Sequence, residues 1–311
     1  MRLLLLLSGL IIIISCGTEP DKINQNPYLA DNQVTIICED LNFGDTFDVK
    51  GITYKKRKRE EITYHNASST CTSGITDMSS LFYFGEVVDG IKTWDVSNVT
   101  NMEAMFLASK YIGNDEIDLS YWDVSSVINM AGLFSQLDNS TFFFTGIENW
   151  NVSKVENMSY IFRSNSDFDL DIGNWDVSGV TDMTGMFAGF GGISMYFNQD
   201  IGNWDVSNVT RMQIMFVNAK KFNHDLSKWD VSSVFDMYQM FDGASEFNQS
   251  IGNWNVSSVN DMGAMFRNAE NFNRDLSNWC VSNITSKPRS FDENSALTTN
   301  QLPVWGTCPG N

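Results

Sequence analysis

Residues 222–244 read FNHDLSKWDVSSVFDMYQMFDGA, and closely similar segments come directly before and after them in the chain. The same pattern reads FNQDIGNWDVSNVTRMQIMFVNA over residues 197–219 and FNQSIGNWNVSSVNDMGAMFRNA over residues 247–269. The nine tryptophans mark the repeat, at positions 94, 122, 150, 175, 204, 229, 254, 279 and 305, with a period of 25 to 29 residues. A period in this range is typical of repeat proteins, in which each unit buries its apolar face against the next. We therefore expect one elongated array instead of separate globular domains.

The apolar residues that follow each tryptophan have helical spacing. In one unit they fall at i, i+3, i+6, i+7 and i+10: Val209, Met212, Met215, Phe216 and Ala219. Residues with this spacing share one face of a helix. The pattern predicts a helix of about three turns in every unit.

Two features lie just before the predicted helix. A serine precedes the apolar stripe in the eight regular units, where its hydroxyl could cap the first helical turn. These serines are Ser97, Ser125, Ser153, Ser178, Ser207, Ser232, Ser257 and Ser282. Ahead of the serine, Trp229, Asp230 and Val231 alternate inward and outward, as in a very short strand. We therefore expect an α/β repeat solenoid, with short parallel strands on one side and short helices on the other.

The repeat resembles the BspA-like family, which is related to the leucine-rich repeats (LRR), and in particular its DUF285 branch. The residues that carry the resemblance are Ile201, Trp204, Val206, Ser207, Val209, Met212, Met215, Phe216 and Ala219. The similarity covers about residues 75–305 in eight copies. The resemblance implies a right-handed, LRR-like solenoid on a bacterial surface protein that binds host proteins or other cells, and it implies no catalytic chemistry.

The chain begins with MRLLLLLSGLIIIISC, in which one Arg precedes an apolar run too short to cross a membrane. Such a run is typical of a signal peptide, here residues 1–15, and Cys16 after it resembles a bacterial lipobox. The resemblance implies cleavage before Cys16 and a lipid anchor on its sulfur. An ordinary secretory signal with an incidental cysteine is the alternative. Gly17 gives no inner-membrane retention cue, so we expect an exported protein anchored at the outer-membrane surface.

Two segments separate the signal from the repeats. Residues 16–33 are polar and contain two prolines, which predicts a flexible tether. Residues 34–74 contain strand-like runs and predict a small β-rich cap. The solenoid is then expected over residues 75–291 and a C-terminal cap over 292–311. The only basic run, KKRKR at residues 55–59, is interpreted as a solvated strand end or loop in preference to a nucleic-acid or anionic-surface site.

The four cysteines beyond Cys16 flank the array. In the aligned units, Cys71 and Cys280 take the position that Asp230 occupies elsewhere, and each has a partner just outside the array. In an exported chain, this arrangement predicts one disulfide at each end. We expect the pairs Cys38–Cys71 and Cys280–Cys308.

The predicted outward strand position forms a ladder of oxygen-bearing side chains. Its members are Asp95, Asp123, Asn151, Asp176, Asp205, Asp230 and Asn255. Like charges at strand spacing repel one another. One interpretation is that each carboxylate accepts local backbone N–H groups at a helix start. The other is an acidic strip that binds Ca²⁺ or a basic partner, since Ca²⁺ prefers oxygen ligands.

Units with extra residues are candidates for binding loops, because insertions in repeats often lie on the binding face. One insertion contains Phe142, Phe143 and Phe144, and another contains Phe190 and Tyr196. The alternative is that these aromatic side chains fill core positions.

Composition narrows the function. The net charge of −18 argues against nucleic-acid binding, which needs a basic surface. With two histidines and no recognisable nucleophile, phosphate-loop or Cys–His pattern, we expect no enzyme and no cofactor apart from a possible Ca²⁺. The main hypothesis is a monomeric adhesion or interaction module for a protein or glycan ligand. The alternative is a structural or accessory protein of the cell envelope.

Overall fold

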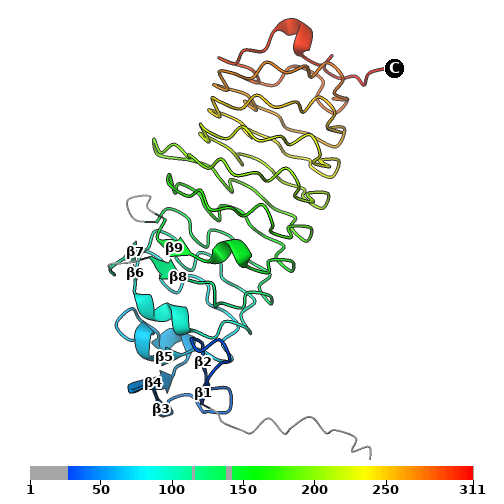
Figure 1. The fold of residues 1–311 in the computed structure, drawn as a ribbon. Helices are drawn as coiled ribbons and strands as arrows, with labels where there is room; N and C mark the ends of the chain where they lie inside the picture. Colours follow the sequence, from blue (N-terminus) through cyan, green and yellow to red (C-terminus); the bar gives the residue numbers. More distant parts are fainter. Residues whose placement is uncertain (1–26, 114–115, 138–141, 311) are drawn as a thin grey trace, which may run out of the picture.

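A computed structural model describes residues 27–113, 116–137 and 142–310. The predicted signal peptide, Cys16 and most of the tether lie outside these residues. A small unit at one end is followed by a row of coils, laid one on the next, that runs to the C-terminus (Figure 1). Within the described ranges, no helix has the length and apolar character needed to cross a bilayer.

The N-terminal unit, residues 27–74, is built from five strands. They are β1 (Tyr28–Leu29), β2 (Ile36–Ile37), β3 (Thr46–Val49), β4 (Ile52–Lys56) and β5 (Thr70–Cys71), with the 3-10 helices η1 (Arg59–Glu61) and η2 (Ala67–Ser69) between β4 and β5. Strands β3 and β4 form an antiparallel hairpin, and β5 pairs with β4 in parallel. Because β1 pairs with β2, the predicted tether cannot extend to residue 33. Its last residues belong to the cap.

The first coils contain short elements of their own. The parallel pairs are β6 (Glu86–Val87) with β7 (Lys110–Tyr111), and β8 (Ile117–Asp118) with β9 (Phe144–Thr145). The 3-10 helices η3 (Asp89–Thr93) and η5 (Ile147–Asn149) lead into Trp94 and Trp150. The later coils are joined by isolated parallel bridges, such as Arg211 with Asp236 and Asp236 with Asp261. Repeat units that follow one another in the sequence therefore also lie side by side in space.

The predicted helices are wrong for the described residues, which contain no α-helix. The apolar stripe instead lies on a turn ribbon, the eight-residue segment that begins at the first Met of each unit, for example residues 212–219. Along it, N–H groups alternate between a carbonyl three residues back and a carbonyl of the following coil. Ile214 and Asn218 have φ angles of 53° and 55°, and such left-handed residues interrupt a right-handed helix. The ribbon places the same apolar residues inward, so the stripe alone did not distinguish the two conformations.

The predicted strand over Trp229, Asp230 and Val231 is also misplaced. The parallel bridges occur further along the unit, at the residue before the first Met, such as Asp236. After Val231 the chain turns at once, because the N–H of Val234 donates to the Val231 carbonyl at 3.0 Å. A leucine-rich-repeat relation and a right-handed winding of the coils remain predictions.

A column of tryptophans runs through the core. Eight indole N–H groups each donate, at 3.0–3.2 Å, to a backbone carbonyl 27 to 32 residues earlier, so each ring is tied to the preceding coil. Trp94, Trp122 and Trp150 stack at centroid distances of 6.4 and 6.3 Å. Trp229 and Trp254 stack in the same way. The expected inward column of indoles is confirmed for these rings.

Two columns of phenylalanine stack beside the indoles. One contains the Phe of each turn ribbon, with Phe216 and Phe241 5.4 Å apart and nearly parallel. The other contains the Phe that lies four residues before a buried Leu or Ile, such as Phe222 before Leu226 and Phe247 before Ile251. All of these rings are fully buried. Together with the buried methionines they form one continuous apolar core.

Both predicted disulfides are present. Cys38 pairs with Cys71 across 33 residues, and Cys280 pairs with Cys308 across 28 residues. The first disulfide lies in the separate core of the N-terminal unit, with Ile36 and Tyr54. The second ties the last coil to the segment that follows η6 (Thr299–Gln301).

Candidate functional site

The predicted oxygen ladder is used locally by the backbone. At all seven positions the Oδ1 atom accepts the N–H of the serine two residues later, at 3.0–3.2 Å. In Asp205 the same oxygen also accepts the Ser207 hydroxyl, at 2.6 Å. The expectation of local N–H bonds is confirmed, although the serine belongs to a turn and not to a helix. Six members are exposed, whereas Asp95 is only 4 % exposed.

The serine bonds lower the pKa of two carboxyl groups of the ladder, Asp205 and Asp230. The Ser207 hydroxyl and N–H hold the pKa of Asp205 below its ordinary value. Ser232 does the same for Asp230, and the neighbouring Asp205 carboxylate opposes the shift. The local donors therefore outweigh the repulsion between successive carboxylates. Among the described residues, no three His, Cys, Asp or Glu side chains gather in a geometry that could hold a metal ion.

A different column of polar side chains marks the surface along which the coils pair. It lies at the bridge position, one residue before the first Met, and in the later coils it contains Asp182, Arg211, Asp236 and Asp261. Arg211 reaches back to Asp182, with 3.5 Å between Nη1 and Oδ2. Sequence reasoning missed this column because it assigned these positions to a helix. The sequence did contain a signal for this column, because the residue before the first Met of each unit is polar.

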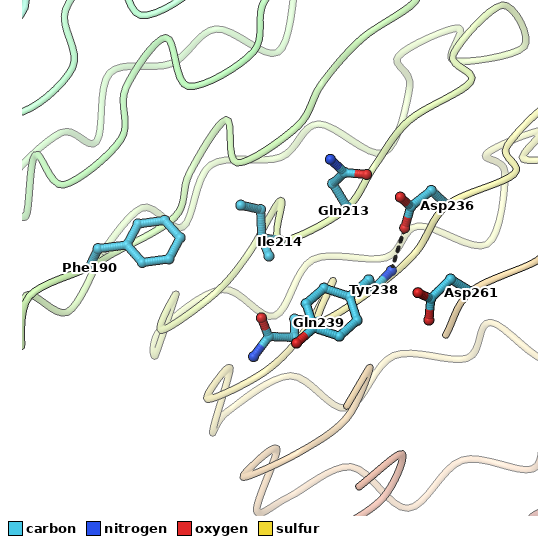
Figure 2. A pocket seen from close by; sticks show the side chains of 7 residues that line it. All are labelled: Phe190, Gln213, Ile214, Asp236, Tyr238, Gln239 and Asp261. Carbon is cyan, nitrogen blue, oxygen red and sulfur yellow. Dashed lines mark hydrogen bonds between the residues drawn. The ribbon is translucent and has the colours of Figure 1, made fainter. Parts of the chain in front are cut away.

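The surface beside this column has a hollow of about 380 Å³. Its lining comes from the end of one turn ribbon at Phe190, from the next two ribbons, and from two carboxylates at the bridge position: Phe190, Gln213, Ile214, Asp236, Tyr238, Gln239 and Asp261. Figure 2 shows the Phe190 ring and Ile214 at one side and the two carboxylates at the other, with Tyr238 and Gln239 between them. The hollow thus offers apolar, aromatic, amide and carboxylate groups within one concave surface.

Two glycines make room for the rings that project from this face. A Cβ on Gly185 would lie 2.5 Å from the Tyr160 ring, and a Cβ on Gly263 would lie 3.0 Å from the Tyr238 ring. Each tyrosine therefore lies flat over the neighbouring coil. The Arg163 guanidinium stacks on the Phe190 ring, 4.8 Å from its centroid. Of these rings, Tyr238 and Phe190 line the hollow, and their contacts with Gly263 and Arg163 hold them there.

The carboxylate side of the hollow carries unbalanced negative charge. Burial raises the pKa of Asp236, the Tyr238 N–H lowers it, and the Asp261 and Asp182 carboxylates raise it further, while Arg211 opposes them. The net direction is upward. Because both burial and like charges disfavour the ionised form, Asp236 would gain from a hydrogen-bond donor or a cation placed in the hollow.

The candidate binding loops divide into two groups. Phe143 and Phe144 are buried, and Phe144 packs 4.8 Å from both Phe106 and Phe134. Phe142 is half-buried and packs edge-on against Phe134 and three other phenylalanines. The interpretation of residues 142–144 as a binding loop is therefore corrected, since these rings fill a core position that the irregular coil would leave empty.

The second insertion stays at the surface. Phe190 lines the hollow, and Tyr196 is 52 % exposed. The extra glycines at positions 191 and 192 both have positive φ, which lets the chain turn sharply after Phe190. Of the predicted loop residues, only Phe190 is brought into the candidate site.

The basic run is structural. The Lys56 ammonium is buried and donates to the carbonyls of Cys38 and Glu39 at 2.9 and 2.8 Å. The Arg57 guanidinium donates to the Ser69 carbonyl, and Arg59 donates to the Ser79 carbonyl. The interpretation of the run as a solvated strand end or loop is corrected for these three residues, because Lys56 and Arg57 bind carbonyls within the cap and Arg59 binds a carbonyl of the first coil.

Comparison with known proteins places the chain in a family. The model of the family described as "Mycoplasma protein of unknown function, DUF285" matches residues 52–141, 113–192, 135–231 and 189–305. No curated protein and no solved structure matches the chain. The overlapping family matches extend from β4 to the C-terminal disulfide region, which is most of the chain. This chain belongs to the DUF285 family.

Proposed function

We propose that this chain is a non-catalytic interaction module that binds a protein or glycan ligand through the hollow around Tyr238. The supporting observation is that aromatic, amide and carboxylate groups from consecutive coils converge on one concave surface. Tyrosine offers large contact area at low entropic cost, and flanking carboxylates accept the hydroxyl or amino groups of a ligand. A repeated backbone with variable outward residues suits recognition, since the side chains can change while the core stays constant.

The binding experiment uses an exposed surface pair as its matched control. The test variant combines Tyr238→Ala with Asp236→Asn in the hollow, and the control combines Tyr121→Ala with Asp123→Asn, which are exposed and lie outside the hollow. Both variants are applied to arrays of glycans and extracellular-matrix proteins. A ligand of the wild type should bind the test variant at least about tenfold more weakly, a loss of about 1.4 kcal/mol, and the control unchanged. Equal binding by all three proteins would refute the role of the hollow.

The proposal includes a lipid anchor at the cell surface. It is supported by the lipobox-like sequence that ends in Cys16. Cells that produce the wild type or Cys16→Ser are fed a clickable fatty acid and then treated with external protease. Label on the wild type only, with protease loss from intact cells, would support a surface lipoprotein. Label on both proteins, or full protease protection, would contradict it.

The second candidate function is a structural or accessory protein of the cell envelope, within an LRR-like right-handed solenoid. The observation that favours it is the uniformity of the core, in which nearly every coil presents the same buried residues. Affinity capture separates the two functions. Enrichment of the producer's own envelope proteins by both the wild type and the hollow variant would favour the structural role. Enrichment of a foreign ligand by the wild type alone would favour the interaction module.

A further inference from the structure

The coils are joined by one repeated set of backbone hydrogen bonds. In each of the first eight turn ribbons, three alternate N–H groups donate to carbonyls of the next ribbon, at 2.7–3.2 Å. In the sixth ribbon the donors are Ile214, Phe216 and Asn218, and the acceptors are Tyr238, Met240 and Asp242. The direction is always the same. Every ribbon offers N–H groups toward the C-terminal end of the array and carbonyls toward the N-terminal end.

The last ribbon, residues 288–295, begins at Pro288 in place of a Met, and its register follows from the Arg289, Phe291 and Glu293 carbonyls that accept from the eighth ribbon. It leaves its own set of donors unpaired within the described residues. Ser290 and Asn294 have φ angles of 54° and 60°, the conformation that marks the donor positions in the preceding ribbons. By this register the free donors are the N–H groups of Ser290, Asp292 and Asn294, and none of them bonds to an acceptor in the described residues. Ser290 and Asp292 are half-buried, and Asn294 is exposed. An unpaired strand edge is a template for pairing with another chain.

The first ribbon, residues 78–85, has the complementary edge. Its carbonyls at Ser79, Leu81 and Tyr83 occupy the acceptor positions of the later ribbons. Arg59 of the cap donates to the Ser79 carbonyl. The Leu81 and Tyr83 carbonyls accept no hydrogen bond from the described residues. The cap therefore covers one end of this edge and leaves two acceptors open.

Exposed apolar side chains lie at the same two ends. Phe84 is 72 % exposed and Val304 is 69 % exposed, the two highest values among the large apolar residues of the described chain. Phe84 belongs to the first ribbon, with Tyr83 edge-on against it at 4.6 Å. Val304 precedes Trp305, which packs edge-on against Phe291 of the last ribbon. The other exposed large apolar residues of the array are less exposed, such as Tyr196 at 52 % and Ile112 at 44 %.

We propose that copies of this chain associate end to end, with the last ribbon of one copy pairing with the first ribbon of the next. The N–H groups of Asp292 and Asn294 would donate to the Leu81 and Tyr83 carbonyls, which continues the register of the array across the junction. Phe84 and Val304 would be removed from water at that junction. Such a heterologous contact uses different surfaces on the two copies and generates open chains of subunits. This proposal replaces the expectation of a monomer.

The experiment blocks each end separately. Phe84→Lys places a charge at the first ribbon, and Val304→Lys places one near the last. The full-length wild type and variants are purified in the same detergent, because the first residues are apolar, and are studied by sedimentation velocity. The wild type should show a weight-average mass that rises with concentration beyond that of a dimer. Each variant alone should remain a single chain.

The mixture of the two variants is the decisive sample. Phe84→Lys keeps an intact C-terminal end and Val304→Lys an intact N-terminal end, so the equimolar mixture should form a dimer of about twice the single-chain mass and nothing larger. Circular dichroism and intact disulfides check that both variants are folded. A wild type that stays a single chain at all concentrations would overturn the proposal. So would association that survives in one variant alone, because that would indicate a contact between two identical ends.

Discussion

The N-terminal cap and the array of coils are stabilised by different kinds of interaction. The cap buries only a small core around Ile36 and Tyr54, and it adds a disulfide and a buried lysine. The coils from Trp94 to Trp254 contain no disulfide, and their apolar side chains form one continuous core in which rings such as Phe216 and Phe241 stack on each other. A unit too small for a large core needs covalent and polar reinforcement, whereas a repeated unit obtains its burial from its neighbours.

The largest loss in the free energy of unfolding should come from removing a buried ring from the core of the array. Phe216→Ala removes a fully buried ring that stacks 5.7 Å from Phe187 and 5.4 Å from Phe241. The expected loss in the free energy of unfolding is about 3–5 kcal/mol, measured by urea denaturation. Phe235→Ala, on a partly exposed ring that contacts Arg211, should cost less than about 1 kcal/mol. Similar losses for both variants would contradict the stacked-core account.

The second effect concerns the cap alone. Replacing Cys38 and Cys71 by Ala opens a loop of 33 residues. In the chain-entropy description this costs about 3–4 kcal/mol. Because the array has its own core, we expect the amide protons of residues 46–56 to exchange faster while those of residues 212–266 stay protected. Hydrogen exchange followed by mass spectrometry measures both regions at once, and uniform acceleration would show that the two parts unfold together.

A smaller effect should follow from the buried lysine of the cap. Lys56→Met keeps the length of the side chain but leaves the Cys38 and Glu39 carbonyls without their donor. Hydrogen bonds from a charged donor contribute about 1.5–3 kcal/mol, so the thermal transition of the cap should fall measurably. Lys58→Met, on an exposed neighbour, is the matched control and should leave it unchanged. Equal behaviour of the two variants would assign no structural role to Lys56.

The smallest effect is a pH dependence in the array. The pKa values of Asp205 and Asp230 are lowered in the folded chain, first by the serine hydroxyls and then by the serine N–H groups. A lowered folded pKa stabilises the protein above the unfolded value near 3.9, and this contribution is lost as the pH falls through the folded pKa. The double variant Ser207→Ala, Ser232→Ala should therefore melt slightly below the wild type at pH 7, and the difference should shrink below about pH 3. A difference that grows toward acid pH would reverse the sign and refute the account.

The core and the disulfides could be predicted from the sequence, whereas the backbone of each unit could not. The Trp, Met and Phe side chains of the repeated sequence pattern were expected to point inward, and residues such as Trp204, Met212 and Phe216 do so. The apolar spacing is compatible with a helix and with a ribbon of turns, and periodicity alone cannot separate them. Non-glycine residues with positive φ, such as Ile214, are rare, so a reading of propensities does not anticipate them.

The candidate site was predictable only in part. Phe190 was singled out as an insertion residue, and it lines the hollow. Asp236 and Tyr238 were missed, because their positions were assigned to the surface of a helix whose neighbours could not be inferred. Phe143 and Phe144 had the right composition for a binding loop, but an enlarged coil has a cavity that aromatic rings fill more favourably than water does.

The pairing of coils through main-chain atoms has an evolutionary consequence. Since each turn ribbon is recognised by its neighbour through N–H and carbonyl groups that every ribbon possesses, one more copy could be inserted, or one removed, without altering either flanking copy. Near-identical DNA segments recombine readily out of register, so lineages would gain or lose whole units in single genetic events. The length of the array could then vary between strains while each surviving unit kept its sequence.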